Sequence, residues 1–194
     1  MRKAEEKRTT KETDITLTLD LDGTGKTEID TGIGFFDHML DAFARHGLFD
    51  LSVHVKGDLA VDCHHTVEDT GIVLGTAIKN ALGDKEGICR FGQRLLPMDD
   101  SLVLCAVDLS GRPYLGYDLA LEQERVGYLD TETVKEFFYA VSYGAMMNIH
   151  LKQLSGENHH HILEAAFKSF GIALSEAVSI DERIEGLRST KGSL

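Results

Sequence analysis

The sequence predicts an α+β fold in which one β-β-α-β-α unit occurs twice. Two pairs of segments resemble each other at one offset of 96 positions: "SVHVK" (52–56) with "NIHLK" (148–152), and "HHTVE" (64–68) with "HHILE" (160–164). In each copy, segments with the period-2 alternation of strands are followed by segments with helical period. We therefore expect two halves, residues 1–90 and 91–194, that form one compact duplicated unit. Each half is a small sheet covered on one face by helices, and a pseudo-two-fold axis relates the halves.

The elements of the first copy follow from its hydrophobic pattern. "ITLTLDLDG" (15–23) alternates apolar and polar residues, as a half-buried strand does, and ends in a glycine turn. "KTEID" (26–30) predicts a second strand, and the apolar residues of 36–43 recur at helical spacing. A strand that carries His54 and a longer helix that begins at His64 complete the unit.

The second copy has the same order. "YLGYDL" (114–119) predicts a strand and residues 131–145 predict a helix. His150 then lies on a strand, and His160 begins the last helix. The segment between the copies, residues 84–101, contains glycine and the first proline, so we expect it to be a linker.

Composition restricts the class of protein. Of the 194 residues, 42% are hydrophobic, which is enough to bury a core. No apolar run approaches the length of about 20 residues that a membrane span requires, and the charged N-terminal segment has no apolar signal region. A formal net charge of -12 disfavours non-specific nucleic-acid binding, and three cysteines without a C-x-x-C pair fit a reducing compartment. We expect a cytoplasmic protein with no membrane or nucleic-acid partner.

Paired histidines begin the last helix of each copy. Three potential ligands lie on each helix outside its apolar stripe: His64, His65 and Glu68 in the first copy, and His160, His161 and Glu164 in the second. One such pair arises easily by accident, but two pairs in register favour metal ligation. Imidazoles and carboxylates without thiolate suit manganese, iron or zinc. Because adjacent histidines on a helix do not easily bind one ion, the simplest interpretation is two ions, each served by both halves.

Other residues are candidates for completing these sites. His38 lies on the preceding helix of the first copy, and Glu136 takes the equivalent place in the second copy. Either side chain is suited to complete a coordination sphere. We expect His54 and His150 either to pack in the core or to contact the metal ligands without binding metal themselves.

Basic residues are placed asymmetrically. Arg90, Arg112 and Lys168 lie in or near the second half, and Ile72 occupies the position equivalent to Lys168. The closing "RSTKGSL" adds hydroxyl and amine groups, Ser189 and Lys191 among them, which are suited to bind phosphate. The presumed metal ligands thus occur in both halves, whereas the positive charge is concentrated in one. This arrangement is expected if one end of the substrate binds metal and the other end is anionic.

Taken together, the motifs resemble the imidazoleglycerol-phosphate dehydratase family of histidine biosynthesis. The resemblance covers nearly the whole chain and rests on these segments: "TKET", "LDLDGTG", "GIGFFDHMLDAFARHGLFDL", "DCHHTVEDTGIVLG", "FGQRLLPMDDS", "DLSGRPY", "EFF", "NHHHILEAAFKSFGIAL" and "STKG". It implies a hydro-lyase that converts imidazoleglycerol phosphate to imidazoleacetol phosphate and water. It also implies two Mn²⁺ ions per active site and a homo-oligomer of 24 subunits built from trimers.

The resemblance also implies roles for particular residues. One ion would be bound by His64, His160, Glu164 and Glu136, and the other by His38, His65, Glu68 and His161. The phosphate would be bound by Arg90, Arg112, Lys168, Ser189 and Lys191. Glu12 of "TKET" would transfer a proton, with Glu68 and Glu164 as further candidate catalytic carboxylates. Ala42 departs from the family pattern, which has glutamine there, so a substrate contact at that position is in doubt.

The expected chemistry explains a need for metal. The substrate proton has no adjacent carbonyl, so direct abstraction by a carboxylate would be very slow. As a hypothesis, the metal-bound ring becomes an imidazolate that expels the hydroxyl, and the resulting diazafulvene acidifies the neighbouring C–H.

Two other functions remain open from the residues alone. A dinuclear metallohydrolase of a phosphate ester would use similar groups, although such enzymes usually rely on Asp-rich ligand sets. A metal-binding structural shell or storage protein would leave Arg112, Lys168 and the C-terminal cluster without a purpose.

Overall fold

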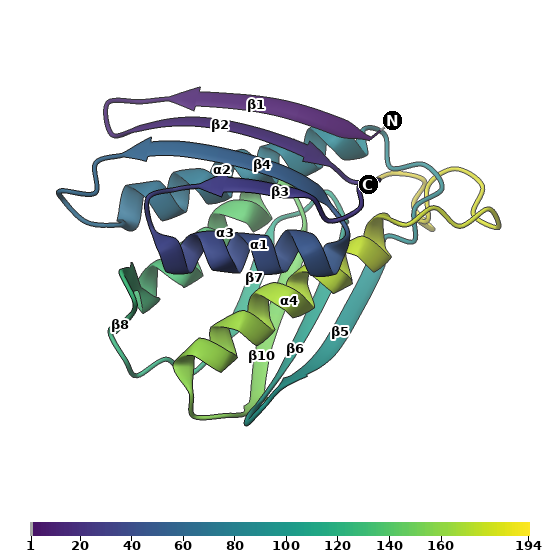
Figure 1. The fold of residues 1–194 in the computed structure, drawn as a ribbon. Coiled ribbons are helices and arrows are strands. Elements are labelled where there is room, and N and C mark those ends of the chain that lie inside the picture. The colour runs from purple at the N-terminus through teal and green to yellow at the C-terminus, as the bar shows by residue number, and fades with distance from the viewer. Residues whose placement is uncertain (1) are drawn as a thin grey trace.

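Four helices lie between two four-stranded sheets in the computed structural model, which describes residues 2–194 (Figure 1). The first half comprises β1 (Lys3–Thr9), β2 (Thr13–Asp20), β3 (Thr27–Asp30), α1 (Gly34–Gly47), β4 (Asp50–Gly57) and α2 (His64–Leu82). The second half comprises β5 (Phe91–Met98), β6 (Ser101–Asp108), β7 (Tyr114–Asp118), the short ribbon β8 (Arg125–Val126) and β9 (Leu129–Asp130), α3 (Thr131–Ala145), β10 (Asn148–Ser155) and α4 (His159–Val178).

The two halves share one topology, which confirms the predicted α+β duplication. The sheet orders are β1-β2-β4-β3 and β5-β6-β10-β7. In each sheet the first three strands pair with one another antiparallel, and the edge strand β3 or β7 pairs parallel with β4 or β10. The parallel pair is connected through α1 in the first half and α3 in the second.

Each half begins with one strand more than the sequence predicted. β1 was missed because its residues are almost all charged or polar and its burial alternates only between exposed and half-buried. β5 lies inside the predicted linker, residues 84–101, so that prediction was wrong for residues 91–98. Both are edge strands, which bury little apolar surface and therefore carry a weak hydrophobic signal.

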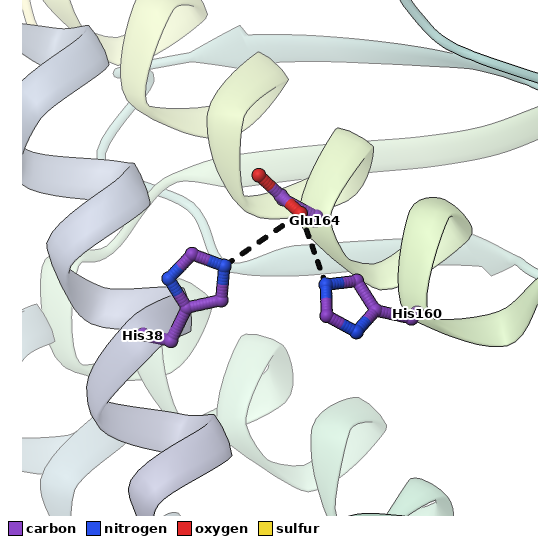
Figure 2. A group of neighbouring side chains, drawn as sticks. All are labelled: His38, His160 and Glu164. Carbon is purple, nitrogen blue, oxygen red and sulfur yellow. Dashed lines mark hydrogen bonds and ion pairs between the residues drawn. The ribbon is translucent and has the colours of Figure 1, made fainter.

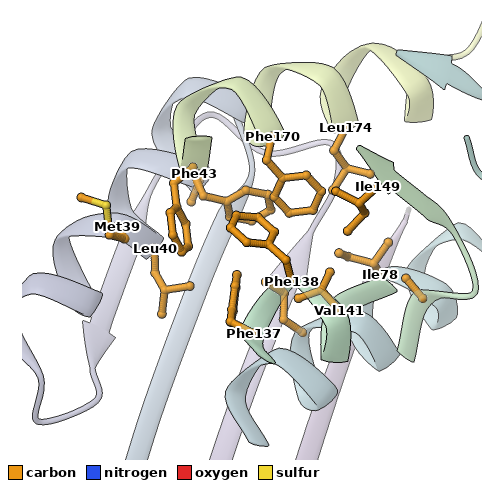
Figure 3. Packing of buried hydrophobic residues seen from close by; sticks show 14 of the residues in the cluster. Met39, Leu40, Phe43, Ile78, Phe137, Phe138, Val141, Ile149, Phe170 and Leu174 are labelled. Carbon is orange, nitrogen blue, oxygen red and sulfur yellow. The ribbon is translucent and has the colours of Figure 1, made fainter. Parts of the chain in front are cut away.

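The helices pair across the halves. α1 packs on α4 and α2 packs on α3, while α1 and α2 also cover the first sheet and α3 and α4 cover the second. Aromatic side chains from three helices meet at the centre of this layer (Figure 3). The Phe43 and Phe170 rings stack at a centroid distance of 5.1 Å, and Phe138 meets Phe170 edge-on at 5.5 Å. The four helices and both sheets therefore share one core.

Two glycines at equivalent places allow the crossed helix pairs to approach closely. A Cβ atom on Gly171 of α4 would lie 2.2 Å from the Phe43 carbonyl oxygen of α1. A Cβ atom on Gly75 of α2 would lie 2.7 Å from the Val141 carbonyl oxygen of α3. Any larger side chain would force the helices apart, so these glycines set the distance between the ligands that the two helices carry.

Two histidine interpretations need correction. His54 and His150 are exposed rather than buried, because they point to the outer faces of β4 and β10. The nearest acidic partner of His54 is Glu28, at 3.6 Å, and His150 packs against Tyr114 at a ring distance of 5.3 Å. Neither lies on the helical side of its sheet, so neither packs in the core.

No helix in the described residues is long and apolar enough to cross a membrane.

Candidate functional site

A cluster of two histidines and one glutamate joins α1 to α4 (Figure 2). Glu164 Oε2 lies 3.2 Å from His160 Nε2 and 3.6 Å from His38 Nε2. In residues 2–194 this is the only group of three or more His, Cys, Asp or Glu side chains whose ligand atoms all lie within 4.8 Å of one another. Two imidazole nitrogens and a carboxylate oxygen at this spacing suit a divalent transition metal.

The environment of Glu164 keeps it ionised. The Glu164 side chain is only 9% exposed, and its Oε1 atom accepts an ion-pair contact from Lys168 Nζ at 2.6 Å. Burial by itself raises the pKa of this carboxyl, but the hydrogen bond and charge of Lys168, aided by His38 and His160, hold the pKa below its usual value. A negatively charged oxygen therefore faces both histidines at neutral pH.

The equivalent helix α2 carries a more open pair. His64 Nε2 lies 3.5 Å from Glu68 Oε2, and the Glu68 side chain is 39% exposed. Ile72 stands where α4 has Lys168, so Glu68 has no lysine in the next turn. Glu136 is half-buried on α3, and α3 packs on α2. His38 has the corresponding place in the other helix pair, because it lies on α1 and α1 packs on α4.

The predicted ligand sets of four are not assembled within one chain. The structure groups His38 with His160 and Glu164, although the family resemblance assigned His38 to the other ion. This grouping follows from the crossed packing of α1 on α4, which the repeat alone does not specify. His65, Glu68, His161 and Glu136 lie outside this group in the described part of the chain.

The second histidine of each pair contacts aspartates that no pattern in the sequence indicated. His65 Nδ1 lies 3.0 Å from Asp58 Oδ2, and this hydrogen bond raises the pKa of His65. His65 Nε2 is 3.9 Å from Glu12 Oε1, which places the predicted proton carrier beside one predicted ligand.

His161 is held in the same way in the second half. His161 Nδ1 lies 2.7 Å from Asp100 Oδ1, and its Nε2 is 3.5 Å from Asp99 Oδ2. Hydrogen bonds from the peptide N–H groups of Asn158 and Glu157, and then the one to His161, hold the pKa of Asp100 well below its usual range. Asp58 and Asp100 lie in turns, where the sequence offered no signal beyond the acidic residue itself.

The predicted phosphate residues divide into two groups. Lys168 belongs to the α1–α4 cluster. Arg90, Arg112, Ser189 and Lys191 lie in or beside the C-terminal segment, residues 188–194. Arg90 pairs with Asp108 at 2.8 Å and donates to the Arg188 carbonyl at 2.8 Å. The Lys191 N–H donates to Ser189 Oγ at 3.2 Å. Arg112 is exposed, and a Cβ atom on the adjacent Gly111 would lie 2.6 Å from the backbone of Leu194. The C-terminal segment thus lies beside both arginines.

Comparison with known proteins identifies the family. The family model of imidazoleglycerol-phosphate dehydratase matches residues 31–174. The imidazoleglycerol-phosphate dehydratase of Lachnoclostridium phytofermentans is 66% identical over 193 residues, covering 100% of this chain and 98% of the relative. The chain belongs to the imidazoleglycerol-phosphate dehydratase family. The corresponding protein of Acetivibrio thermocellus is 60% identical over 193 residues, covering 100% of this chain and 99% of that relative.

Solved structures of imidazoleglycerol-phosphate dehydratases have the same fold. The Staphylococcus aureus structure superimposes with a TM-score of 0.84 at 37% identity and covers 92% of this chain and 99% of that chain. The Pyrococcus furiosus structure, determined in complex with (S)-C348, gives a TM-score of 0.84 at 43% identity and covers 97% and 100%. The duplicated halves of this chain therefore form the imidazoleglycerol-phosphate dehydratase fold.

Proposed function

We propose that this chain dehydrates imidazoleglycerol phosphate to imidazoleacetol phosphate and water in histidine biosynthesis, as a cytoplasmic enzyme. The observation that carries the proposal is the full-length family match together with the His38, His160 and Glu164 cluster beside Lys168. The match favours a dehydratase over a phosphoester hydrolase or a structural shell protein.

We further propose that the enzyme uses two Mn²⁺ ions per active site. One ion would be held by His64, Glu136, His160 and Glu164, and the other by His38, His65, Glu68 and His161. The donor chemistry of the described cluster, two imidazoles and one carboxylate, fits such an ion. When bound, manganese acts as a Lewis acid toward the imidazole ring of the substrate.

Because the sets of four are not complete within one chain, we propose that neighbouring subunits supply the missing ligands. A 24-subunit assembly built from trimers would bring the α1–α4 cluster of one subunit to the α2 face of another. Metal binding would then be coupled to assembly, since each ion would join ligands from separate chains.

The chain's own residues would bind the substrate and move its protons. Arg90, Arg112, Ser189 and Lys191 would bind the phosphate from the C-terminal side, and Lys168 would contact it from the metal cluster. Glu12 would take up or return a proton, since its carboxylate is exposed on the β1–β2 turn and lies 3.9 Å from His65. Loss of the hydroxyl with one proton forms water, and the remaining enol becomes the ketone of the product.

The test is turnover by metal-free protein before and after resupply of Mn²⁺, with release of imidazoleacetol phosphate as the measurement. We expect turnover only with metal, and Mg²⁺ added at the same concentration serves as the control for non-specific ion effects. Absence of turnover with a fully metallated protein would contradict the proposal. Size-exclusion chromatography of the metal-free sample tests the coupling of metal binding to assembly. We expect the assembly to dissociate without metal, and an assembly that stayed intact would contradict the coupling.

A further inference from the structure

The second histidine of each HH pair is anchored through the same ring nitrogen. His65 Nδ1 contacts Asp58 at 3.0 Å, and His161 Nδ1 contacts Asp100 at 2.7 Å. Because an ionised carboxylate only accepts hydrogen bonds, Nδ1 carries the proton in both rings. The lone pair of each neutral ring is therefore on Nε2.

The same nitrogen is presented by the other histidines of the site. His160 and His38 direct Nε2 toward Glu164, and His64 directs Nε2 toward Glu68. His65 and His161 direct Nε2 toward Glu12, at 3.9 Å, and Asp99, at 3.5 Å, so Nε2 faces a carboxylate in all five imidazoles. For His65 and His161, however, the ring orientation depends on an aspartate outside the predicted ligand sets.

The two aspartates come from segments that the duplication does not relate. Asp58 directly follows β4, whose counterpart in the second sheet is β10. Asp100 lies in the turn between β5 and β6, whose counterpart is the turn between β1 and β2. Duplication of a single ancestral Asp–His contact does not explain both pairs, because the aspartate comes from a different loop in each half. This recurrence indicates that the Nδ1 contact itself has a function.

We propose that Asp58 and Asp100 are positioning residues that fix the Nδ1–H tautomer and the orientation of His65 and His161, so that Nε2 is available to metal. This inference rests on the proposed function for the identity of the metal. Partners of this kind orient a ligand and raise its basicity, and their loss typically lowers metal affinity by about 10–100-fold.

The two anchors differ in what else they bind, which makes the proposal specific. Asp100 Oδ2 also accepts the N–H groups of Glu157 and Asn158 just before α4, at 2.7 and 3.0 Å. Asp58 Oδ1 is buried and has no hydrogen-bond partner in the described part of the chain. Asparagine keeps one acceptor oxygen, which suffices for the single contact of Asp58 but not for the contacts of Asp100 with His161, Glu157 and Asn158 together.

The first experiment measures Mn²⁺ affinity of metal-stripped, full-length protein by equilibrium competition with a chelator. We expect Asp58→Ala and Asp100→Ala each to weaken binding by about 10–100-fold. Asp58→Asn should stay close to the parent protein, whereas Asp100→Asn should fall between the parent and the alanine variant. Asp50→Ala is the matched control, because Asp50 also accepts two peptide N–H groups, from Thr24 and Lys26, at 2.7 and 2.9 Å.

The second measurement is the tautomer itself, by solid-state ¹⁵N NMR of histidine-labelled, metal-free protein. We expect Asp100→Ala to move the His161 signal, and Asp58→Ala the His65 signal, from the Nδ1–H form toward a mixture with the Nε2–H form. Unchanged tautomers with unchanged affinity would overturn the proposal, and an equal affinity loss in Asp50→Ala would show a purely structural effect. If the tautomers and affinities shift as expected but the parent protein does not dehydrate the substrate, only the proposed function fails.

Discussion

The two HH-x-x-E helices have the same ligand sequence but different surroundings. On α4, Glu164 is nearly buried and contacts His38, His160 and Lys168. On α2, Glu68 is far more exposed and its described ion-pair partner is His64 alone.

The difference shows what duplication preserves and what it leaves free to change. The spacing of ligands on a helix is local, so both copies retain the i,i+4 contact between histidine and glutamate. The charge around that contact depends on the residue one turn further along the helix. This residue is Lys168 in α4 and Ile72 in α2. One half can therefore direct positive charge to an anionic substrate while both halves continue to bind metal.

The largest effect is expected from removal of the carboxylate charge in each helix. Glu164→Gln and Glu68→Gln should each lower turnover by more than about 100-fold, because loss of groups that merely orient a metal ligand already costs about 10–100-fold. Only Glu164→Gln should also destabilise the fold, by about 1–3 kcal/mol, because it leaves Lys168 without its partner in a largely buried place. Steady-state kinetics and urea unfolding measure the two quantities. Equal losses of stability in both variants would remove the proposed distinction between the helices.

The next effect concerns the glycines that let each helix pair approach. Gly171→Ala should lower the free energy of unfolding by about 1–3 kcal/mol, the usual cost of overpacking. Gly75→Ala should cost less, because its Cβ would lie 2.7 Å rather than 2.2 Å from the facing carbonyl. Thermal unfolding measures both, with the exposed helical residue Lys79→Ala as control. If Gly171→Ala proved as stable as the parent, α1 and α4 would not be as tightly constrained as the structure indicates.

Much of this site was predictable because it depends on local periodicity. The positions of His64 and His160 at the start of helices, and of their glutamates one turn later, follow from the sequence repeat. The partner of each helix was not predictable in the same way. His38 precedes α2 in the chain but lies beside α4, because the helices pair across the halves.

An edge strand with few apolar residues of its own was also missed. β1 alternates between exposed and half-buried residues, so its hydrophobic pattern carries little information about its role in the sheet. Asp58 and Asp100 were missed for a related reason. Their contacts with His65 and His161 join turns to helices, and turn residues show no periodicity from which a partner could be inferred.

A smaller effect should follow from exchanging the residues that distinguish the helices. Lys168→Ile copies the α2 residue into α4 and should raise the KM for the phosphorylated substrate by about 10–100-fold, the equivalent of one charged hydrogen bond. Ile72→Lys, the reverse exchange on α2, lies on a half-buried surface and should change stability by less than about 0.5 kcal/mol. Inhibition by inorganic phosphate gives a second measurement, since it should weaken only in Lys168→Ile. A rise in KM for both exchanges would mean that the charge asymmetry has no role in substrate binding.

The smallest effect concerns a pair of positions on the outer side of α1 and α3. Counting back from the left-handed residues Leu48 and Met146 that end these helices, the same two positions hold Asp41 and Arg45 in α1 but Tyr139 and Tyr143 in α3. The ion pair spans 2.9 Å, and the tyrosine rings lie 4.3 Å apart at their centroids.

Double-mutant cycles to alanine measure the coupling energy of each pair. The two coupling energies should differ in size and in their dependence on salt. Exposed i,i+4 ion pairs contribute about 0.3–0.5 kcal/mol, whereas aromatic pairs contribute about 0.5–1.5 kcal/mol beyond their buried area. The coupling of the ion pair should fall further at about 1 M salt, where the screening length is about 3 Å, but the coupling of the tyrosines should persist. A tyrosine coupling that also vanished at high salt would mean that the α3 pair is not held by ring contact, and that the two helices differ less than their sequences imply.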